Sequence, residues 1–135
     1  MEIRPYLTFN GSCAEAVELY KRAFDIGSIS IMRFSDIPGF DVPPEYGERI
    51  AQATMMFGDN FIRMSDRGPN HAANTVSTDL ISIAVEGTVE ETRRAFEVLA
   101  DGGRIGMALA KTFYSPCAGV VYDKFGIMWN FSAKQ

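Results

Sequence analysis

The stretch Phe9–Ile29, FNGSCAEAVELYKRAFDIGSI, can be laid on Val85–Ile105, VEGTVEETRRAFEVLADGGRI, without a gap. The positions that agree are Gly11 with Gly87, Ser12 with Thr88, Glu15 with Glu91, Tyr20 with Phe96, Gly27 with Gly103 and Ile29 with Ile105. Self-similarity at a constant offset indicates that one structural unit occurs twice in the chain. The agreement lies in the pattern of residue types rather than in extended identity.

Each copy predicts a helix that begins just after a glycine and a hydroxyl residue, Ser12 or Thr88, which suit the N-cap position. The apolar residues at helical spacing are Ala16, Val17, Leu19, Tyr20, Ala23 and Phe24 in the first copy, and Val89, Ala95, Phe96 and Leu99 in the second. Gly27 and the pair Gly102-Gly103 are expected to end these helices, because glycine tolerates the left-handed conformation.

Strands are predicted at 6–9, 28–34, 50–57 and 60–65 in the first copy, and at 81–85, 104–109, 119–122 and 127–131 in the second. The order is therefore β-α-β-β-β twice, an α+β fold in which a single helix covers one face of each sheet. The open faces are expected to form a trough around a small-molecule cleft. We predict one domain over 1–135, with module one at about 1–66, a linker at about 67–78 and module two at about 79–135.

Composition excludes several classes of partner. The net charge of −4 and the pI near 5.0 argue against a nucleic-acid partner, which normally requires a basic surface. No apolar run approaches the roughly 18 residues that span a bilayer, so we expect no membrane insertion. Cys13 and Cys117 lack metal-ligand spacing and fit a reducing cytoplasm. The proline-rich segment 35–48 suits a lid, a dimer contact or a solvated loop.

Two spaced motifs carry a family resemblance. The first is Pro5-Tyr6-Leu7-Thr8-Phe9-Asn10-Gly11, followed in the helix by Ala16, Tyr20 and Phe24, and the second is Thr112-Phe113-Tyr114 followed by Gly119, Asp123, Phe125-Gly126 and Trp129. With them the chain resembles the vicinal oxygen chelate superfamily, which includes glyoxalase I, bleomycin-resistance proteins and extradiol dioxygenases. It is most similar to the PhnB-like branch, some of whose members are labelled demethylubiquinone methyltransferase. The resemblance implies paired modules and a homodimer, but no particular reaction.

Metal-dependent members of this superfamily place four ligands on the first and last strands of the modules. The corresponding positions here are Pro5, Ser65, Leu80 and Asn130, none of which is a charged or imidazole ligand. Many PhnB-like relatives have a histidine where this chain has Gln52, and its single histidine, His71, falls in the predicted linker. The resemblance therefore predicts no metal site and no cofactor.

Strand alternation predicts which side chains face the cleft. If Ile62 and Met64 face the helix, then Arg63 faces the cleft, where its guanidinium would suit a carboxylate or phosphate. The alternative is an Arg63 paired with Asp66 or Asp59 on an exposed strand. The full set of predicted ligand-binding residues is Thr8, Arg63, Ser65, Ser82, Tyr114, Tyr122, Met128 and Asn130.

Three further side chains have competing interpretations. Tyr114 lies on the loop where the family closes its cleft, whereas Phe113 beside it is expected to pack in the core. Cys13 is expected to be a small filler at the helix start rather than a reactive thiol.

The leading functional hypothesis is a metal-free protein that binds a small, partly apolar ligand. The alternative is a metal-independent lyase, isomerase or transferase that uses Tyr114, Tyr122 or Asp123 as acid or base. A methyltransferase is not favoured, because the sequence has no glycine-rich strand-to-helix nucleotide loop. The residues therefore favour a binding protein over an enzyme.

Overall fold

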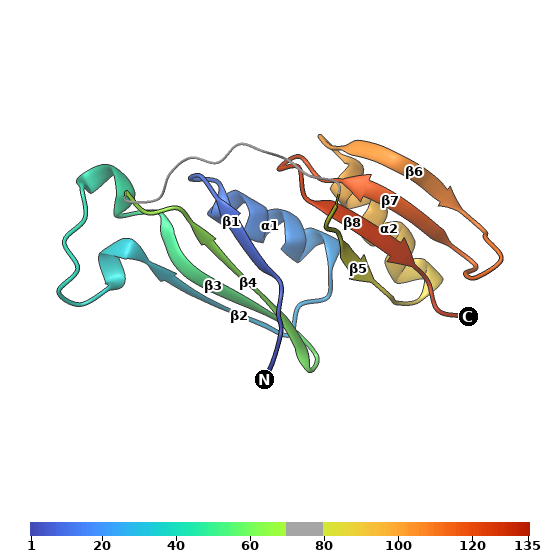
Figure 1. The fold of residues 1–135 in the computed structure, drawn as a ribbon, viewed down its shortest axis with the longest axis horizontal. Coiled ribbons are helices and arrows are strands. Elements are labelled where there is room, and N and C mark those ends of the chain that lie inside the picture. Colours follow the sequence, from blue (N-terminus) through green and yellow to red (C-terminus); the bar gives the residue numbers. More distant parts are fainter. Residues whose placement is uncertain (70–79) are drawn as a thin grey trace. The chain divides into compact units, whose positions relative to one another are not determined.

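A computed structural model describes residues 1–69 and 80–135 and contains the same order of elements twice (Figure 1). The first module comprises β1 (Tyr6–Phe9), α1 (Cys13–Ala23), β2 (Ser28–Arg33), β3 (Ile50–Phe57) and β4 (Asn60–Asp66). The second comprises β5 (Ile83–Val85), α2 (Val89–Ala100), β6 (Arg104–Ala110), β7 (Ala118–Tyr122) and β8 (Met128–Ser132). The predicted α+β class and the tandem β-α-β-β-β modules are confirmed. His71 and most of the predicted linker lie outside the described residues.

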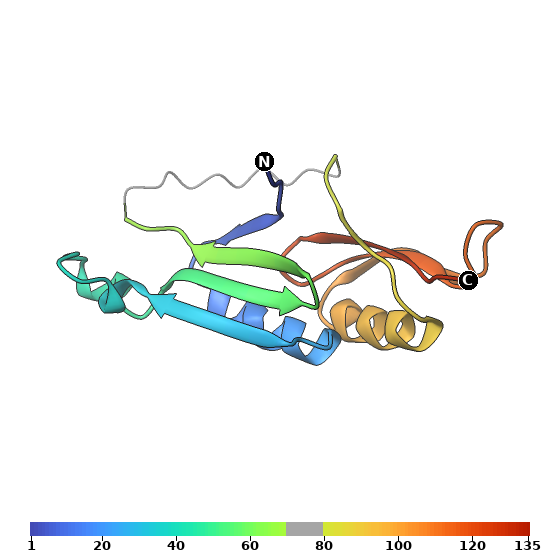
Figure 2. The ribbon, with the colours of Figure 1, turned by 90° about the horizontal axis from the view of Figure 1, so that it is seen from below.

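Each module forms one open four-stranded sheet, with order β1-β4-β3-β2 in the first and β5-β8-β7-β6 in the second. The first strand pairs in parallel with the last, and the remaining neighbours are antiparallel. The helix carries the chain from one edge strand to the opposite edge, and it covers one face of the sheet on the way (Figure 2). The other face of each sheet has no helix from its own module.

The chain divides into two compact units, and the division falls within α1. Unit one contains Met1–Glu18 together with β2, β3 and β4, and its buried helix residues include Cys13, Ala16 and Val17. Unit two contains Leu19–Phe24 together with the elements from β5 onward. No helix within residues 1–69 and 80–135 has the length and apolarity to cross a membrane.

Aromatic rings form the core of unit two. Trp129 is 1% exposed, and its ring centroid lies 5.2 Å from those of both Tyr20 and Phe24. Phe131 packs edge-on against Phe96 of α2 with centroids 6.0 Å apart. Large buried rings supply much of the hydrophobic stabilisation of a small domain, so these residues anchor both helical segments to β8.

The ends of the helices test the predicted caps. Thr88 caps α2 in a capping box, accepting from the Glu91 amide while the Glu91 carboxylate accepts from the Thr88 amide. Gly102 follows α2 with a φ of +76°, as predicted. The prediction for Gly27 is wrong, because α1 ends earlier at Ala23 and Gly27 has no positive φ.

The segment 35–48 begins within one short 3-10 helix, Phe34–Asp36, and contains a second, Pro44–Tyr46, so it is organised rather than extended. Phe34 stacks on the half-exposed Phe40 with centroids 6.1 Å apart. Arg33 fixes both ends of the segment, because its amide donates to Asp36 and its guanidinium donates to the Glu48 carbonyl.

Candidate functional site

The open face of the first sheet carries a polar row that crosses all four strands. The register aligns Tyr6 with Arg63, Arg63 with Thr54, and Thr54 with Ser30. The neighbouring row, on the opposite face, consists of the buried Leu7, Met64 and Ala53 and, at the sheet edge, the exposed Ile31. Ile62 and Met64 are buried and Arg63 is exposed, as strand alternation predicted. The open face therefore presents a guanidinium flanked by hydroxyl groups.

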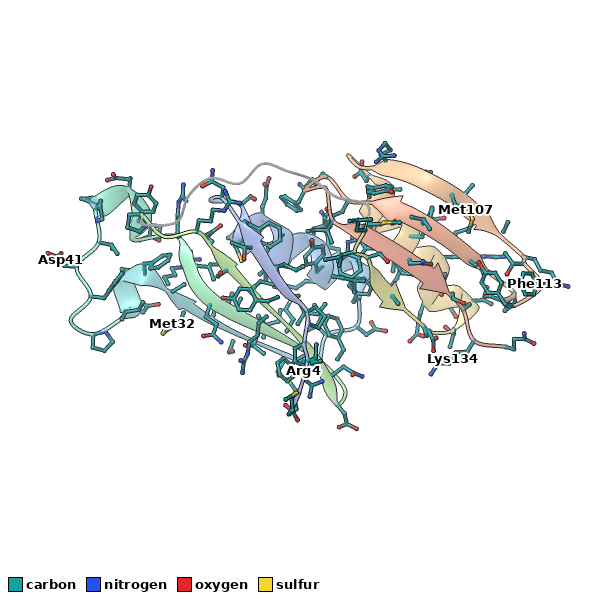
Figure 3. All side chains as sticks on the ribbon, viewed as in Figure 1. Arg4, Met32, Asp41, Met107, Phe113 and Lys134 are labelled. Carbon is teal, nitrogen blue, oxygen red and sulfur yellow. The ribbon has the colours of Figure 1, made fainter. Side chains whose placement is uncertain are left out.

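Four side chains at one end of this face form what we term the arginine patch: Arg4, Tyr6, Phe61 and Arg63. The guanidinium carbon of Arg4 lies 4.4 Å from the centroid of the Phe61 ring, and that of Arg63 lies 5.2 Å from the same centroid. Figure 3 labels Arg4 beside the first sheet. Both cations therefore contact one aromatic ring, a favourable electrostatic arrangement.

The predicted alternative for Arg63, an ion pair with Asp66 or Asp59, is wrong. Within residues 1–69 and 80–135, no carboxylate lies within ion-pair distance of Arg63. Asp66 is 3% exposed and bonds to backbone amides instead. The Arg63 guanidinium is therefore exposed and is not neutralised by a carboxylate of the described residues.

Thr8 and Ser65 lie opposite each other on β1 and β4, one row beyond Tyr6 and Arg63. Thr8 is exposed, whereas Ser65 is only 8% exposed. A ligand on this face would thus contact Thr8 more readily than Ser65. Their assignment as binding residues stays a prediction.

The Asp66 carboxylate organises unit one and was missed by the sequence analysis. Its Oδ1 accepts from the amides of Gly11 and Cys13 at 2.8 and 2.9 Å, and its Oδ2 accepts from the Ile50 amide at 3.0 Å. A carboxylate from β4 therefore satisfies an amide at the start of α1, where negative charge is stabilising. The available signal was an acidic residue ending a strand with a buried pattern.

Cys13 lies beside this carboxylate and is fully buried. Burial, and secondarily the charge of Asp66, raises the pKa of the Cys13 thiol to about 12. The thiol stays protonated at neutral pH, so it is not a nucleophile. This agrees with its expected role as a small filler at the helix start.

The second module carries a similar arginine–aromatic contact. On its open face, Met128 aligns with Tyr122 and Tyr122 with Arg104. The Arg104 guanidinium carbon lies 3.9 Å from the centroid of the Tyr122 ring. Asn130 is exposed in the next row, and Ser82 is exposed just before β5. The structure thus places Tyr122, Met128 and Asn130 on one face, with Ser82 off the strand.

The loop between β6 and β7 presents two aromatic side chains to solvent. Phe113 is 98% exposed and Tyr114 is 49% exposed, with their rings edge-to-face at 5.1 Å (Figure 3). The prediction that Phe113 packs in the core is wrong, because Thr112 and Ser115 close a tight turn that directs it outward. Tyr114 therefore lies on an exposed loop rather than on the sheet.

Asp123 is a buried structural residue and does not suit acid–base chemistry. It is 3% exposed, and its Oδ2 accepts from the Tyr20 hydroxyl at 2.6 Å and from the Trp129 indole at 2.9 Å. Its Oδ1 accepts from the amides of Phe125 and Ile127, which fixes the turn before β8. Both carboxylate oxygens are occupied by these donors, so the predicted turn-forming role is confirmed.

The four positions that hold metal in some superfamily members do not fit a divalent ion here. Pro5 and Leu80 have no donor atom in their side chains, Ser65 offers a neutral hydroxyl and Asn130 a neutral amide. Within residues 1–69 and 80–135, no three His, Cys, Asp or Glu side chains gather to hold a metal ion. Protein sites for divalent cations normally include at least one charged oxygen, thiolate or imidazole ligand, and this set of four has none.

Comparison with known proteins identifies relatives over the full length. The chain is 31% identical to Protein YjdN of Escherichia coli strain K12, covering 96% of this chain and 92% of that one. It is 30% identical to protein PA1353 of Pseudomonas aeruginosa, with a TM-score of 0.86 over 100% of this chain and 98% of the other. It is also 30% identical to the PhnB protein of Bacillus cereus, with a TM-score of 0.75 over 99% and 100% of the two chains.

A more distant structure shares the fold. The fosfomycin resistance protein FosX of Listeria monocytogenes is 10% identical, with a TM-score of 0.66 over 100% of this chain and 94% of the other. No family model matches the chain. The level of identity to the three full-length relatives, together with this shared fold, shows that the chain belongs to the PhnB-like branch of the vicinal oxygen chelate superfamily.

Proposed function

We propose that this protein binds a small molecule with an anionic group and an apolar body, that it needs no metal ion to do so, and that it is a binding protein rather than an enzyme. The observation that carries the proposal is Arg63, exposed on an open sheet face without a carboxylate partner among the described residues. Thr54 and Tyr6 flank it in the same row. A guanidinium fork with neighbouring hydroxyl groups suits a carboxylate or phosphate.

Thr8 offers a further polar contact on the same face of the first sheet as Arg63. On the open face of the second sheet, taken by itself, Tyr122 and Asn130 offer polar contacts and Met128 offers an adaptable apolar surface. A ligand of roughly 15 to 20 heavy atoms at about −0.3 kcal/mol per atom would bind with a dissociation constant between sub-millimolar and tens of micromolar. Tighter binding therefore needs a strong anchor such as Arg63.

The test compares biphenyl-4-carboxylate with its neutral analogue, biphenyl-4-methanol, by NMR titration. Wild-type protein is expected to bind the carboxylate, and Arg63→Ala to bind it roughly tenfold more weakly, because a charge-assisted hydrogen bond is lost. The neutral alcohol should bind both proteins alike. Arg93→Ala, which removes an exposed arginine from α2, is the matched control and should resemble wild type. Equal carboxylate affinity in wild type and Arg63→Ala would refute the proposal.

We also propose a homodimer, the assembly implied by the family. The edge strands β2 and β6 expose apolar side chains: Ile31 is 46%, Met32 40%, Ile105 53% and Met107 41% exposed. Figure 3 labels Met32 and Met107. Exposed apolar edge strands favour pairing with another chain, and a second copy supplies a self-complementary partner.

Light scattering coupled to gel filtration tests this assembly. Wild-type protein is expected to elute with twice the 14.9 kDa chain mass, and the Ile105→Lys, Met107→Lys double variant to elute as a monomer. Lys is chosen because charge on an edge strand opposes pairing. A wild-type protein that stays monomeric at high micromolar concentration would exclude the dimer.

The cysteines bear on the compartment in which the protein works. The two buried free thiols, Cys13 and Cys117, support a reducing cytoplasm.

A further inference from the structure

We infer that the arginine patch is a clamp for a doubly charged oxyanion, as found in a phosphate monoester, with Arg4 and Arg63 as its two cationic arms. This inference rests on the proposed function and deepens it, because it names the charge class of the ligand. It also adds Arg4, which lies outside the strand predicted at 6–9, as a second cation beside Arg63.

The parallel register brings the four residues of the patch onto one face. Tyr6 on β1 is the partner of Arg63 on β4. Arg4 and Phe61 precede these two residues by two positions, and successive side chains alternate between the faces of a sheet. The amide of Arg63 donates to the Pro5 carbonyl, so the chain immediately after Arg4 is already fixed against β4. The two arginines therefore lie on neighbouring chain segments, offset by two positions, and both contact Phe61.

Phe61 holds the two cations close together. With both guanidinium carbons within 5.2 Å of one ring centroid, their separation is below a Debye length of about 10 Å at 0.1 M salt. Their mutual repulsion is therefore only partly screened. The attraction of each cation to the ring opposes this repulsion but does not neutralise the charge. An anion that contacts both guanidiniums would remove the repulsion.

The donors of Arg4 are poorly satisfied. Its Nε is buried and has no hydrogen-bond partner. Its nearest carboxylate is that of Glu2, 3.5 Å from Nη2, and the Glu2 side chain is 74% exposed. A pair of this length and exposure is weak and easily displaced. Arg63 has no carboxylate partner among the described residues. The buried Nε is out of reach of an external acceptor, but the Arg4 side chain is 31% exposed and Arg63 is exposed, so a ligand can approach both guanidinium groups.

The two positive charges of Arg4 and Arg63 favour a ligand with two negative charges over a ligand with one. A single carboxylate has two oxygens and one charge, which suffices for one guanidinium fork. A phosphate monoester presents three terminal oxygens and nearly two negative charges above pH 7. It can therefore bond to both guanidiniums at once and compensate both charges. The half-exposed Tyr6 hydroxyl is the remaining donor in the patch.

The experiment compares two probes with one apolar body, biphenyl-4-yl phosphate and biphenyl-4-carboxylate, together with inorganic phosphate alone. NMR titrations at pH 8 and constant 0.15 M sodium chloride would be run on wild type, Arg4→Gln, Arg63→Ala and Arg104→Ala. Gln keeps much of the length of Arg4 over Phe61 without its charge. Arg104→Ala removes an arginine with the same kind of aromatic contact from the second module.

Wild type is expected to bind the phosphate ester about tenfold more tightly than the carboxylate, and inorganic phosphate detectably. Arg4→Gln should abolish that preference while changing carboxylate binding less than about threefold, and Arg63→Ala should weaken both probes. Arg104→Ala should change neither. Wild-type protein without the preference, or Arg4→Gln that retains it, would overturn the clamp and leave the proposed function standing. Carboxylate binding that is unaffected in Arg63→Ala would overturn both.

Discussion

Asp123→Ala is expected to destabilise the protein by at least about 3 kcal/mol, a large share of the 5 to 15 kcal/mol typical of a domain. The substitution removes the carboxylate that accepts from the buried Tyr20 hydroxyl, from the buried Trp129 indole and from two amides of the turn before β8. Each buried donor that loses its partner costs about 1–3 kcal/mol. The effects combine because these donors share one carboxylate.

Urea denaturation followed by fluorescence measures this loss, since Trp129 is the only tryptophan and lies at the site. Asp41→Ala is the control, because Asp41 is exposed on the loop before Pro44–Tyr46 (Figure 3), and it should stay within about 0.5 kcal/mol of wild type. Asp123→Asn keeps the shape and one carbonyl oxygen, so it should lose less than Asp123→Ala. An Asp123→Ala protein with the wild-type midpoint would show that the four hydrogen bonds do not stabilise the fold.

Gly103→Ala is expected to cost about 3 kcal/mol or more, whereas Gly27→Ala at the equivalent position of the first module should cost less than about 1 kcal/mol. A Cβ on Gly103 would lie 2.2 Å from the Tyr122 carbonyl oxygen and 2.8 Å from that of Leu99. Both are backbone atoms, so no flexible side chain can move to make room. A Cβ on Gly27 would lie 3.7 Å from the Met56 carbonyl oxygen, an ordinary contact.

The two variants, Gly27→Ala and Gly103→Ala, are informative together because the sequence repeat aligns these glycines, whereas their surroundings in the structure differ. Equilibrium unfolding in urea gives both free energies under the same conditions. Comparable losses in the two variants would mean that the close approach of β7 to Gly103 relaxes without cost. A marked loss in Gly103→Ala alone would show that this glycine is required by packing rather than by backbone conformation, since its φ is not positive.

In the candidate site, the side of a strand on which a residue lies could be predicted from sequence, but its contacts with other strands could not. Alternation correctly placed Ile62 and Met64 on the buried face and Arg63 on the exposed face, because the side-chain period of a strand depends on local sequence alone. The contact of Arg4 with Phe61 depends on which strands pair and in which register, and Arg4 lies outside the predicted strand at 6–9. Phe113 was misplaced because burial of an aromatic residue was inferred from its type, whereas the turn at Thr112 and Ser115 directs it outward.

The duplicated β-α-β-β-β order, both helices and the eight strands of the described residues, the strands to within two residues, could be predicted from local sequence, because they follow from periodicity and glycine placement. The partners of the buried carboxylates could not be predicted: Asp66 accepts from amides at the start of α1, and Asp123 accepts from Tyr20, a residue 103 positions away. Those carboxylates bond across large sequence separations. Their partners are therefore set by packing and strand register, which no local pattern encodes.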